Sequence, residues 1–423
     1  MNRRNVWLVV LSFLLVCALL FNLSGCGTVS AAEATDLMKG VEAQEVEGKV
    51  FDDAFGNNQM ELALKLFKSS ADATKNQNTL VSPLSIQLAL AMTANGANGE
   101  TLKEMEALLG NGMSIDDLNR YLKSYVEGLP STKKAKLQIA NSIWFRNDEN
   151  RLKVEKNFLQ TNADYYGADA FKAPFDNSTL KKINDWVKEN TDSMIDKVLD
   201  SIDDDAVMYL INAITFDAEW QTVYSKNAVR DGIFTNIDGK KKTVSMMYSE
   251  ESRFISDGKA TGFLKAYKGG KYSFAALLPN EGVDLYDYIT GLDADSLKNT
   301  LSNPKYTEVA ATMPKFSYDY ELKMNEVLCE QGMAKAFDSE NADFTKLGRS
   351  SRGNIYIGDV LHKTFISVDE LGTKAGAVTK VEMVDKMAAF DRKVVTLDRP
   401  FVYMIIDNET NLPIFMGAVT DIE

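Results

Sequence analysis

The segment VDELGTKAGAVTKVEMVDKMAAF, residues 368–390, combines the alternation of a β-strand with residues that form strands poorly. One face consists of Thr373, Ala375, Ala377, Thr379, Val381 and Met383, and the other of Lys374, Gly376, Val378, Lys380 and Glu382. The first face carries no charge, so it could be buried while the second stays wet. The glycines and alanines give little intrinsic drive to form a strand. We therefore predict a segment that has the pattern of a strand but little intrinsic tendency to form one.

The first 25 residues predict export from the cytoplasm. MNRR supplies positive charge, the apolar stretch VWLVVLSFLLVCALLF follows, and LSGC resembles a bacterial lipobox. Cleavage before Cys26 would leave a lipidated cysteine, which anchors a protein to a membrane without spanning it. The alternative is an ordinary signal peptide or a single membrane anchor. We expect a lipid-anchored, extracytoplasmic protein of the cell envelope, with release from the cell as a variant.

The rest of the chain predicts a tether and one folded unit. Residues 26–52 are small and acidic, which is typical of a flexible linker with a root-mean-square span of about 28 Å. Residues 53–423 contain no Pro/Gly/Ser-rich linker and no internal repeat. Hydrophobic residues make up 45% of the chain, which suffices for a large core. We expect a signal peptide (1–25), a lipidated tether (26–52) and a single domain (53–423).

Composition excludes several function classes. The formal net charge is −13 and no run of Lys and Arg interleaves with aromatic residues, so we expect no nucleic-acid partner. Cys17 leaves with the signal and Cys26 would carry lipid, so Cys329 alone remains and no disulfide framework is expected. The single histidine, His362, gives little basis for a zinc cluster or a Ser-His-Asp triad. We expect neither a metal site nor an enzyme.

Helical patterns come mainly first and strand patterns mainly later. SPLSIQLALAMTANG has Ser82 as its predicted N-cap and Pro83 at the first helical position, and Gly96 ends it. In TLKEMEALLG, Thr101 and Glu104 have the spacing of a capping box. KLQIANSIWFRN, AVMYLINAITF, YSFAALLP and RPFVYMIIDNETNLPIFMGAVT predict strands. This order favours an α+β class over alternating βαβ units.

Several separated blocks then resemble the serpin family, in order and at family spacing. They are NTLVSPLSIQLALAMTANGANGETLKEMEALLG, INDWVKENTDSMIDKVL, AVMYLINAITFDAEW, MPKF, LCEQGMAKAFDSENADFTKL, VLHKTFISVDELGTKAGA and DRPFVYMIIDNETNLPIFMGAV. The resemblance covers residues 55–423. It implies a serpin fold, with helices clustered on a large central mixed or antiparallel sheet, further sheets and an exposed reactive-centre loop. The chain departs from the family at Asp217 and Ala218, at Tyr224 (commonly Phe) and at Lys374 (usually Glu).

The resemblance implies an irreversible inhibitor of serine proteases. A protease would cut the loop as a substrate, and the cleaved loop would enter the central sheet as a new strand, trapping the acyl-enzyme. The implied partner is a serine protease in a covalent complex with a monomer, a cysteine protease being a further candidate; no cofactor is implied. The implied hinge consists of Glu370, Gly372, Thr373, Ala375, Ala377 and Thr379. A one-residue slip would bury Lys374, at a cost of several kcal/mol.

Family spacing from Glu370 places the reactive bond at Lys386–Met387, and a lysine before the cut suits a trypsin-like protease. The bonds 385–386, 387–388 and 388–389 remain alternatives; the last two would suit chymotrypsin-like or elastase-like proteases.

The resemblance also assigns polar groups to the place where the central strands part. Ser82, Ser85, Asn212 and His362 match a cluster beneath the sheet. Glu370 and Lys315 match an ion pair at the top of the opening, next to Trp220. Ordinary helix capping and surface charge are the alternative explanations.

Two other functions remain open at this point. A non-inhibitory serpin, acting as a binding or carrier protein, would be cut without trapping the protease. An extracytoplasmic solute-binding lipoprotein would also carry a lipobox and a tether, but it requires two alternating α/β lobes.

Overall fold

The central β-sheet of this protein has seven strands in the order β1-β5-β3-β6-β15-β14-β12. We describe residues 34–146, 152–203, 206, 208–351, 353–373 and 392–422 of a computed structural model. The strands are β1 (Thr35–Asp36), β5 (Asp169–Ala173), β3 (Ala135–Arg146), β6 (Met208–Glu219), β15 (Gly372–Thr373), β14 (Leu361–Val368) and β12 (Phe316–Lys323). Because β15 is antiparallel to both β6 and β14, those two strands run in the same direction on either side of it.

A second, nine-stranded sheet has the order β16-β11-β8-β9-β10-β17-β18-β2, with β7 paired to β8. Its strands are β16 (Lys393–Thr396), β11 (Lys305–Pro314), β8 (Lys241–Ser256), β9 (Ala260–Ala266), β10 (Tyr272–Pro279), β17 (Phe401–Asp407), β18 (Pro413–Val419), β2 (Thr79–Val81) and β7 (Val229–Thr235). A small sheet pairs β13 (Gly348–Ser350) with β4 (Leu152–Val154).

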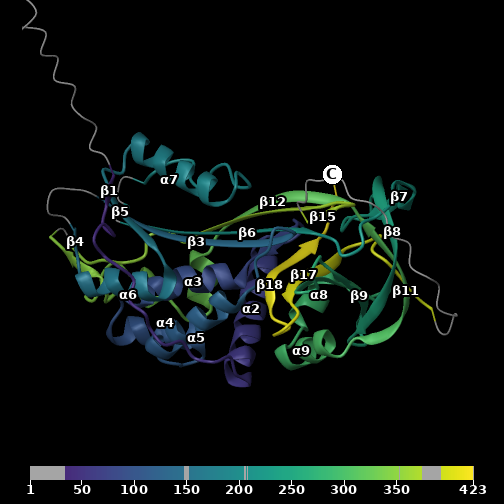
Figure 1. Cartoon of the computed structure of the whole chain (residues 1–423), viewed down its shortest axis with the longest axis horizontal. Helices are drawn as coiled ribbons and strands as arrows, with labels where there is room; N and C mark the ends of the chain where they lie inside the picture. Colours follow the sequence, from purple (N-terminus) through teal and green to yellow (C-terminus); the bar gives the residue numbers. More distant parts are fainter. Residues whose placement is uncertain are drawn as a thin grey trace, which may run out of the picture.

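Helices cover both faces of the central sheet, with α7 on one side and α3 to α6 on the other (Figure 1). The helices are α2 (Asp53–Ala73), α3 (Pro83–Ala94), α4 (Gly99–Gly110), α5 (Ile115–Gly128), α6 (Lys156–Tyr166), α7 (Asn177–Asn190), α8 (Leu285–Thr290), α9 (Ala294–Ser302) and α10 (Asn325–Glu330), with the 3₁₀ turns η1 (Lys226–Ala228) and η2 (Lys335–Phe337). The predicted α+β class is confirmed.

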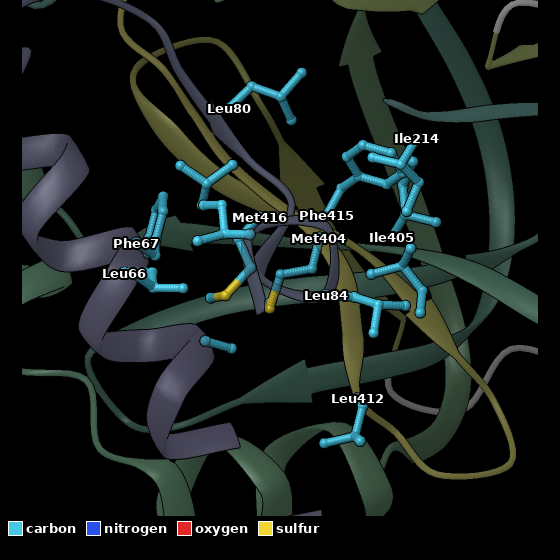
Figure 2. Packing of buried hydrophobic residues seen from close by; sticks show 14 of the residues in the cluster. Leu66, Phe67, Leu80, Leu84, Ile214, Met404, Ile405, Leu412, Phe415 and Met416 are labelled. Atoms are coloured by element: carbon cyan, nitrogen blue, oxygen red, sulfur yellow. The ribbon is translucent and has the colours of Figure 1, made fainter. Parts of the chain in front are cut away.

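Helix α3 lies in the interior, and every one of its residues is buried. It begins as predicted: the Ser82 side chain accepts a hydrogen bond from the Ser85 amide, and Pro83 occupies the first turn. Strands β17 and β18 are also buried along their whole length. Figure 2 shows their side chains, including Met404 and Met416, meeting Leu66 and Phe67 of α2. This core lies against one face of the central sheet, where α3 contacts β6 and β2 contacts β14.

The predicted capping box of the next helix is wrong. Helix α4 begins at Gly99, with Asn98 as its N-cap residue. The Thr101 hydroxyl instead accepts a hydrogen bond from the Asp343 amide at 2.9 Å. The Glu104 carboxylate accepts one from the Lys335 amide at 2.8 Å. Both side chains therefore bind segments distant in sequence, which makes them tertiary contacts rather than caps.

The prediction of a flexible tether is corrected for residues 34–52, which lie against the body. Strand β1 pairs with β5, opposite Phe171 and Lys172. Further along, the Lys49 amide donates to the Arg120 carbonyl at 3.0 Å, and its ammonium lies 2.7 Å from Asp117. Backbone hydrogen bonds therefore hold parts of this segment against the body, although its acidic composition predicted flexibility. Across the ranges described above, no helix has the length and apolar character needed to cross a membrane.

Strands β1 and β15 lie toward opposite ends of the central sheet (Figure 1). Asp36 of β1 pairs with Phe171 of β5, Phe171 pairs with Trp144 of β3, and Trp144 pairs with Tyr209 of β6. At the other end of β6, Ala218 pairs with Thr373. Nine residues of strand correspond to about 30 Å. The N-terminal segment and the hinge are therefore separated by most of the sheet's length.

Candidate functional site: the hinge and the sheet opening

The hinge is a tight turn that joins β14 to β15. The Asp369 carboxylate accepts hydrogen bonds from the amides of Leu371 at 2.8 Å and Gly372 at 3.1 Å. Gly372 is required at this place, because a Cβ atom there would lie 2.0 Å from the Ala218 carbonyl oxygen. The local sequence thus reverses the chain and directs it back between β6 and β14.

Thr373, the first predicted inward residue of the hinge, is already part of the sheet. It pairs with Ala218 on one side and Val368 on the other, and is 2% exposed. Its hydroxyl lies 2.5 Å from the Tyr267 hydroxyl. The inward orientation predicted for this residue is therefore observed.

The turn is held by backbone hydrogen bonds from the chain that follows β6. The Trp220 amide donates to the Leu371 carbonyl at 2.8 Å, and its indole Nε1 donates to the Asp369 carbonyl at 2.8 Å. The Tyr224 amide donates to the Glu370 carbonyl at 3.0 Å. The Trp220 ring is fully buried and stacks on Tyr267, at 4.5 Å between centroids. Three consecutive hinge carbonyls thus have fixed donors.

The structure also forms the predicted ion pair between Lys315 and Glu370, at 2.5 Å. The hydrogen bond from Lys315 lowers the pKa of the Glu370 carboxyl below its ordinary value. Both side chains are more than one-third exposed, at 36% and 37%. Pairs this exposed contribute about 0–1 kcal/mol, so this one adds little to closure of the sheet by itself.

The predicted polar cluster forms as two linked sets of hydrogen bonds. The Ser82 amide donates to His362 Nε2 at 3.2 Å, and the Ser82 hydroxyl donates to the Ile414 carbonyl at 2.9 Å. The Ser85 hydroxyl donates to the Asn212 side chain, which in turn donates to Asn141. These contacts connect α3 to β6, β14 and β3.

His362 is buried and neutral in this cluster. Burial lowers the pKa of its imidazole from 6.5 to about 4. Nε2 already accepts the Ser82 amide hydrogen bond, so it is occupied as an acceptor. This arrangement gives the histidine a structural role between α3 and β14.

The sheet-opening residues fall into two groups rather than one. Asn212 and Trp220 are eight residues apart along the chain through β6, which corresponds to about 26 Å. Ser82, Ser85 and His362 lie with Asn212, whereas Lys315 lies with Trp220 and the hinge.

Four residues of this region were missed by sequence reasoning. They are Asn141 in the lower cluster, and Tyr267, Lys265 and Glu251 beside the hinge. The available signal was the lysine inside the apolar run FLKAY, which sits on a strand that is otherwise mostly buried. The remaining predicted site residues, Ala375, Ala377, Thr379, Lys386, Met387 and Cys26, lie outside the described residues.

Taken together, this geometry defines a central sheet in which the two-residue strand β15 lies between two longer strands. Two parallel neighbours flank a hinge that has entered between them by two residues.

Comparison with known proteins identifies the family to which this arrangement of strands belongs. Residues 57–422 match the family described as serpin (serine protease inhibitor). The thermophilic serpin tengpin, in its native state, is 51% identical with a TM-score of 0.88, covering 92% of this chain and 100% of that one. Its latent-state structure is 52% identical with a TM-score of 0.80, covering 89% and 100%. The chain belongs to the serpin family.

More distant relatives extend the comparison. Intracellular coagulation inhibitor 2 of Tachypleus tridentatus is 30% identical over 362 residues, covering 82% of this chain and 86% of that protein. Human thyroxine-binding globulin is 23% identical with a TM-score of 0.77, covering 87% and 98%, a likeness of fold alone. The alternative of a solute-binding lipoprotein with two α/β lobes is dropped, because the fold and the family differ from it.

Proposed function

We propose that this serpin is an irreversible suicide-substrate inhibitor of serine proteases. The observation that carries the proposal is strand β15, which is antiparallel to both β6 and β14 and already pairs with them through Thr373. The chain beyond Thr373 would continue in the same direction, beside the ten residues of β6 that precede Ala218. That length corresponds to about 33 Å of strand.

Insertion would also satisfy the physical demands of the segment. Each new residue would gain backbone hydrogen bonds to two strands, and the uncharged face, which includes Ala375 and Ala377, would be buried. Cleavage releases the C-terminal end of the loop, so that this gain becomes available only after the protease has attacked. A serpin that inserts before the acyl-enzyme is hydrolysed keeps the protease bound.

We propose Lys386–Met387 as the reactive bond and a trypsin-like enzyme as the target, from family spacing and the lysine side chain. On mixing the chain, residues 27–423, with trypsin, we expect a covalent complex that survives SDS on a denaturing gel. Mass spectrometry should find a released fragment that begins at Met387. The residues 34–49 are retained because they contact the body.

The other outcomes of that experiment separate the alternatives. Cleavage at this bond without a complex would identify a substrate-like or non-inhibitory serpin. A complex whose fragment begins at another residue would keep the mechanism and move the reactive bond. If trypsin leaves the loop intact, chymotrypsin-like and elastase-like proteases are the next to test, and failure with all of them would overturn the inhibitory function.

We further propose that Cys26 carries lipid and attaches the protein to a membrane outside the cytoplasm. Because residues from Thr35 onward pair with the body, only about eight residues separate the anchor from it, a reach of at most about 28 Å. The attachment end is opposite the hinge, so that the hinge end of the body would point away from the membrane.

Replacing the anchor residue tests this attachment. In a bacterial host, Cys26→Ser is expected to move the protein from the membrane fraction to the soluble extracytoplasmic fraction, because serine lacks the thiol to which the lipid would be attached. The matched control is Cys329→Ser, which removes the other cysteine of the mature chain and should leave the distribution unchanged. Continued membrane association of a Cys26→Ser protein from which residues 1–25 have been cleaved would contradict the lipid anchor.

A further inference from the structure

The region beside the hinge contains a buried ion pair that the family resemblance did not predict. Lys265 lies on β9 and is 2% exposed, with its ammonium 2.7 Å from the Glu251 carboxylate on β8. The same carboxylate accepts a hydrogen bond from the Ser249 hydroxyl at 2.7 Å. A buried ammonium is costly unless it is paired, so the position of Lys265 is fixed by Glu251.

The ammonium of Lys265 also contacts two aromatic rings. It lies 4.4 Å from the centroid of the Tyr224 ring and 5.4 Å from that of Trp220. Both distances are within the range of cation–π attraction, which is strongest when the cation is desolvated, as it is here. The Tyr224 hydroxyl lies 3.4 Å from the Ser249 hydroxyl. The departure from phenylalanine at position 224 therefore joins this ring to the same network.

These two aromatic residues are the ones that hold the hinge turn. Trp220 donates two hydrogen bonds, to the carbonyls of Asp369 and Leu371, and the Tyr224 amide donates to that of Glu370. The contacts thus lead from the buried pair, through two aromatic residues, to three consecutive carbonyls: the Trp220 ring binds one of them directly, and the backbone amides of Trp220 and Tyr224 bind the other two.

We propose that Lys265 is a positioning residue for loop insertion. Its ammonium, fixed by Glu251, orients the side chains of Trp220 and Tyr224, and the Trp220 indole together with the backbone amides of both residues holds the turn at residues 369–371. This hinge turn then fixes Thr373 as the first inserted residue, and so sets the register in which the rest of the loop enters the sheet. The consequence for trapping rests on the proposed inhibitory function, whereas the effect on the hinge does not.

The test compares hydrogen exchange of the uncut full chain and its Lys265→Met variant. Methionine has a similar length without the charge. We expect the amides of Trp220 and Tyr224 to exchange about tenfold faster in the variant, because the turn opens more often. Amides within the buried strand β17 should keep their protection. Unchanged exchange at Trp220 and Tyr224 would overturn the proposal.

Two further variants separate positioning from general stability. Lys134→Met is the matched control: it removes a cation that pairs with the buried Glu219 at the same end of the sheet. Among the described residues, Lys265 alone makes cation–π contacts with Trp220 and Tyr224, so Lys134→Met should leave hinge exchange unchanged. Equal acceleration in both variants would contradict a specific role of Lys265.

The double variant Lys265→Met/Glu251→Gln removes the unpaired carboxylate as well. We expect its urea midpoint to return toward that of the unmodified protein, while hinge exchange stays fast because no cation orients the rings. Restored protection in the double variant would reduce the pair to a structural role and overturn the proposal.

The effect on trapping is measured separately, with a protease that the unmodified protein traps. Both variants that lack Lys265 should then need about threefold more inhibitor per protease, since slower insertion lets more acyl-enzyme hydrolyse. An unchanged ratio would contradict the link to insertion. If the unmodified protein traps no protease, the inhibitory function fails and hydrogen exchange alone decides the role of Lys265.

Discussion

Thr373→Arg is expected to convert the proposed inhibitor into a substrate. Thr373 is 2% exposed and paired on both sides, so an arginine there would place an unpaired cation inside the sheet. Burying such a charge costs several kcal/mol, enough to expel β15 and to delay insertion past hydrolysis of the acyl-enzyme. With a protease that the unmodified protein traps, we expect at least about a tenfold loss of covalent complex, with cleavage at the same bond.

The control for this experiment is Thr373→Val, which has the same shape without a charge. It loses the contact between the hydroxyls of Thr373 and Tyr267 and leaves the buried Tyr267 hydroxyl without this partner, at a cost of about 1–3 kcal/mol, but it keeps the inward face uncharged. It should therefore still form the complex. Full inhibition by Thr373→Arg would rule out insertion through this hinge.

Acid is expected to destabilise the folded protein through His362. In the folded protein the pKa of His362 is about 4, below the ordinary value of 6.5. Between these pH values the imidazole is therefore protonated in the unfolded chain but not in the folded protein. This contribution to stability is complete above pH 6.5 and is lost progressively as the pH falls toward 4. The loss amounts to about 2 kcal/mol at pH 5 and about 3 kcal/mol below pH 4.

Urea unfolding at pH 7.5 and pH 5.0 measures this effect. His362→Gln keeps a side-chain acceptor for the Ser82 amide but has no titrating group, so the fall between these two pH values should largely disappear. The Glu370 carboxyl, whose pKa is lowered, contributes its own loss only below about pH 4.5, outside the window measured. Equal falls in both proteins would show that His362 is not the responsible group.

Short-range features were predictable because neighbouring residues determine them. The N-cap at Ser82 and the proline that follows it lie within one turn of each other. The turn at Asp369 is equally local, although its pattern was not singled out in the sequence, whereas the need for glycine at position 372 comes from the Ala218 carbonyl of the distant strand β6. The capping box at Thr101 was wrong for the converse reason, because Asp343 supplies a tertiary partner that a local pattern does not include.

Long-range polar contacts were predictable only where the family resemblance supplied them. The pair of Lys315 with Glu370 was expected in this way and is present. Lys265 was not expected, because alternation along β9 does not tell whether a lysine faces solvent or a carboxylate on the next strand. The acidic tether was likewise assigned to solvent, although Lys49 binds Asp117 of α5.

The amino-acid sequence by itself determined the family, the order of helices and strands, and the inward orientation of Thr373 at the hinge, because these follow from local periodicity and from ordered blocks. Only the tertiary structure decided which polar groups meet. It separated Asn212 from Trp220 by about 26 Å, and it buried Lys265 beneath the residues that hold the hinge. The physical reason is that the free energy of a buried charge depends on the partners that distant strands bring to it.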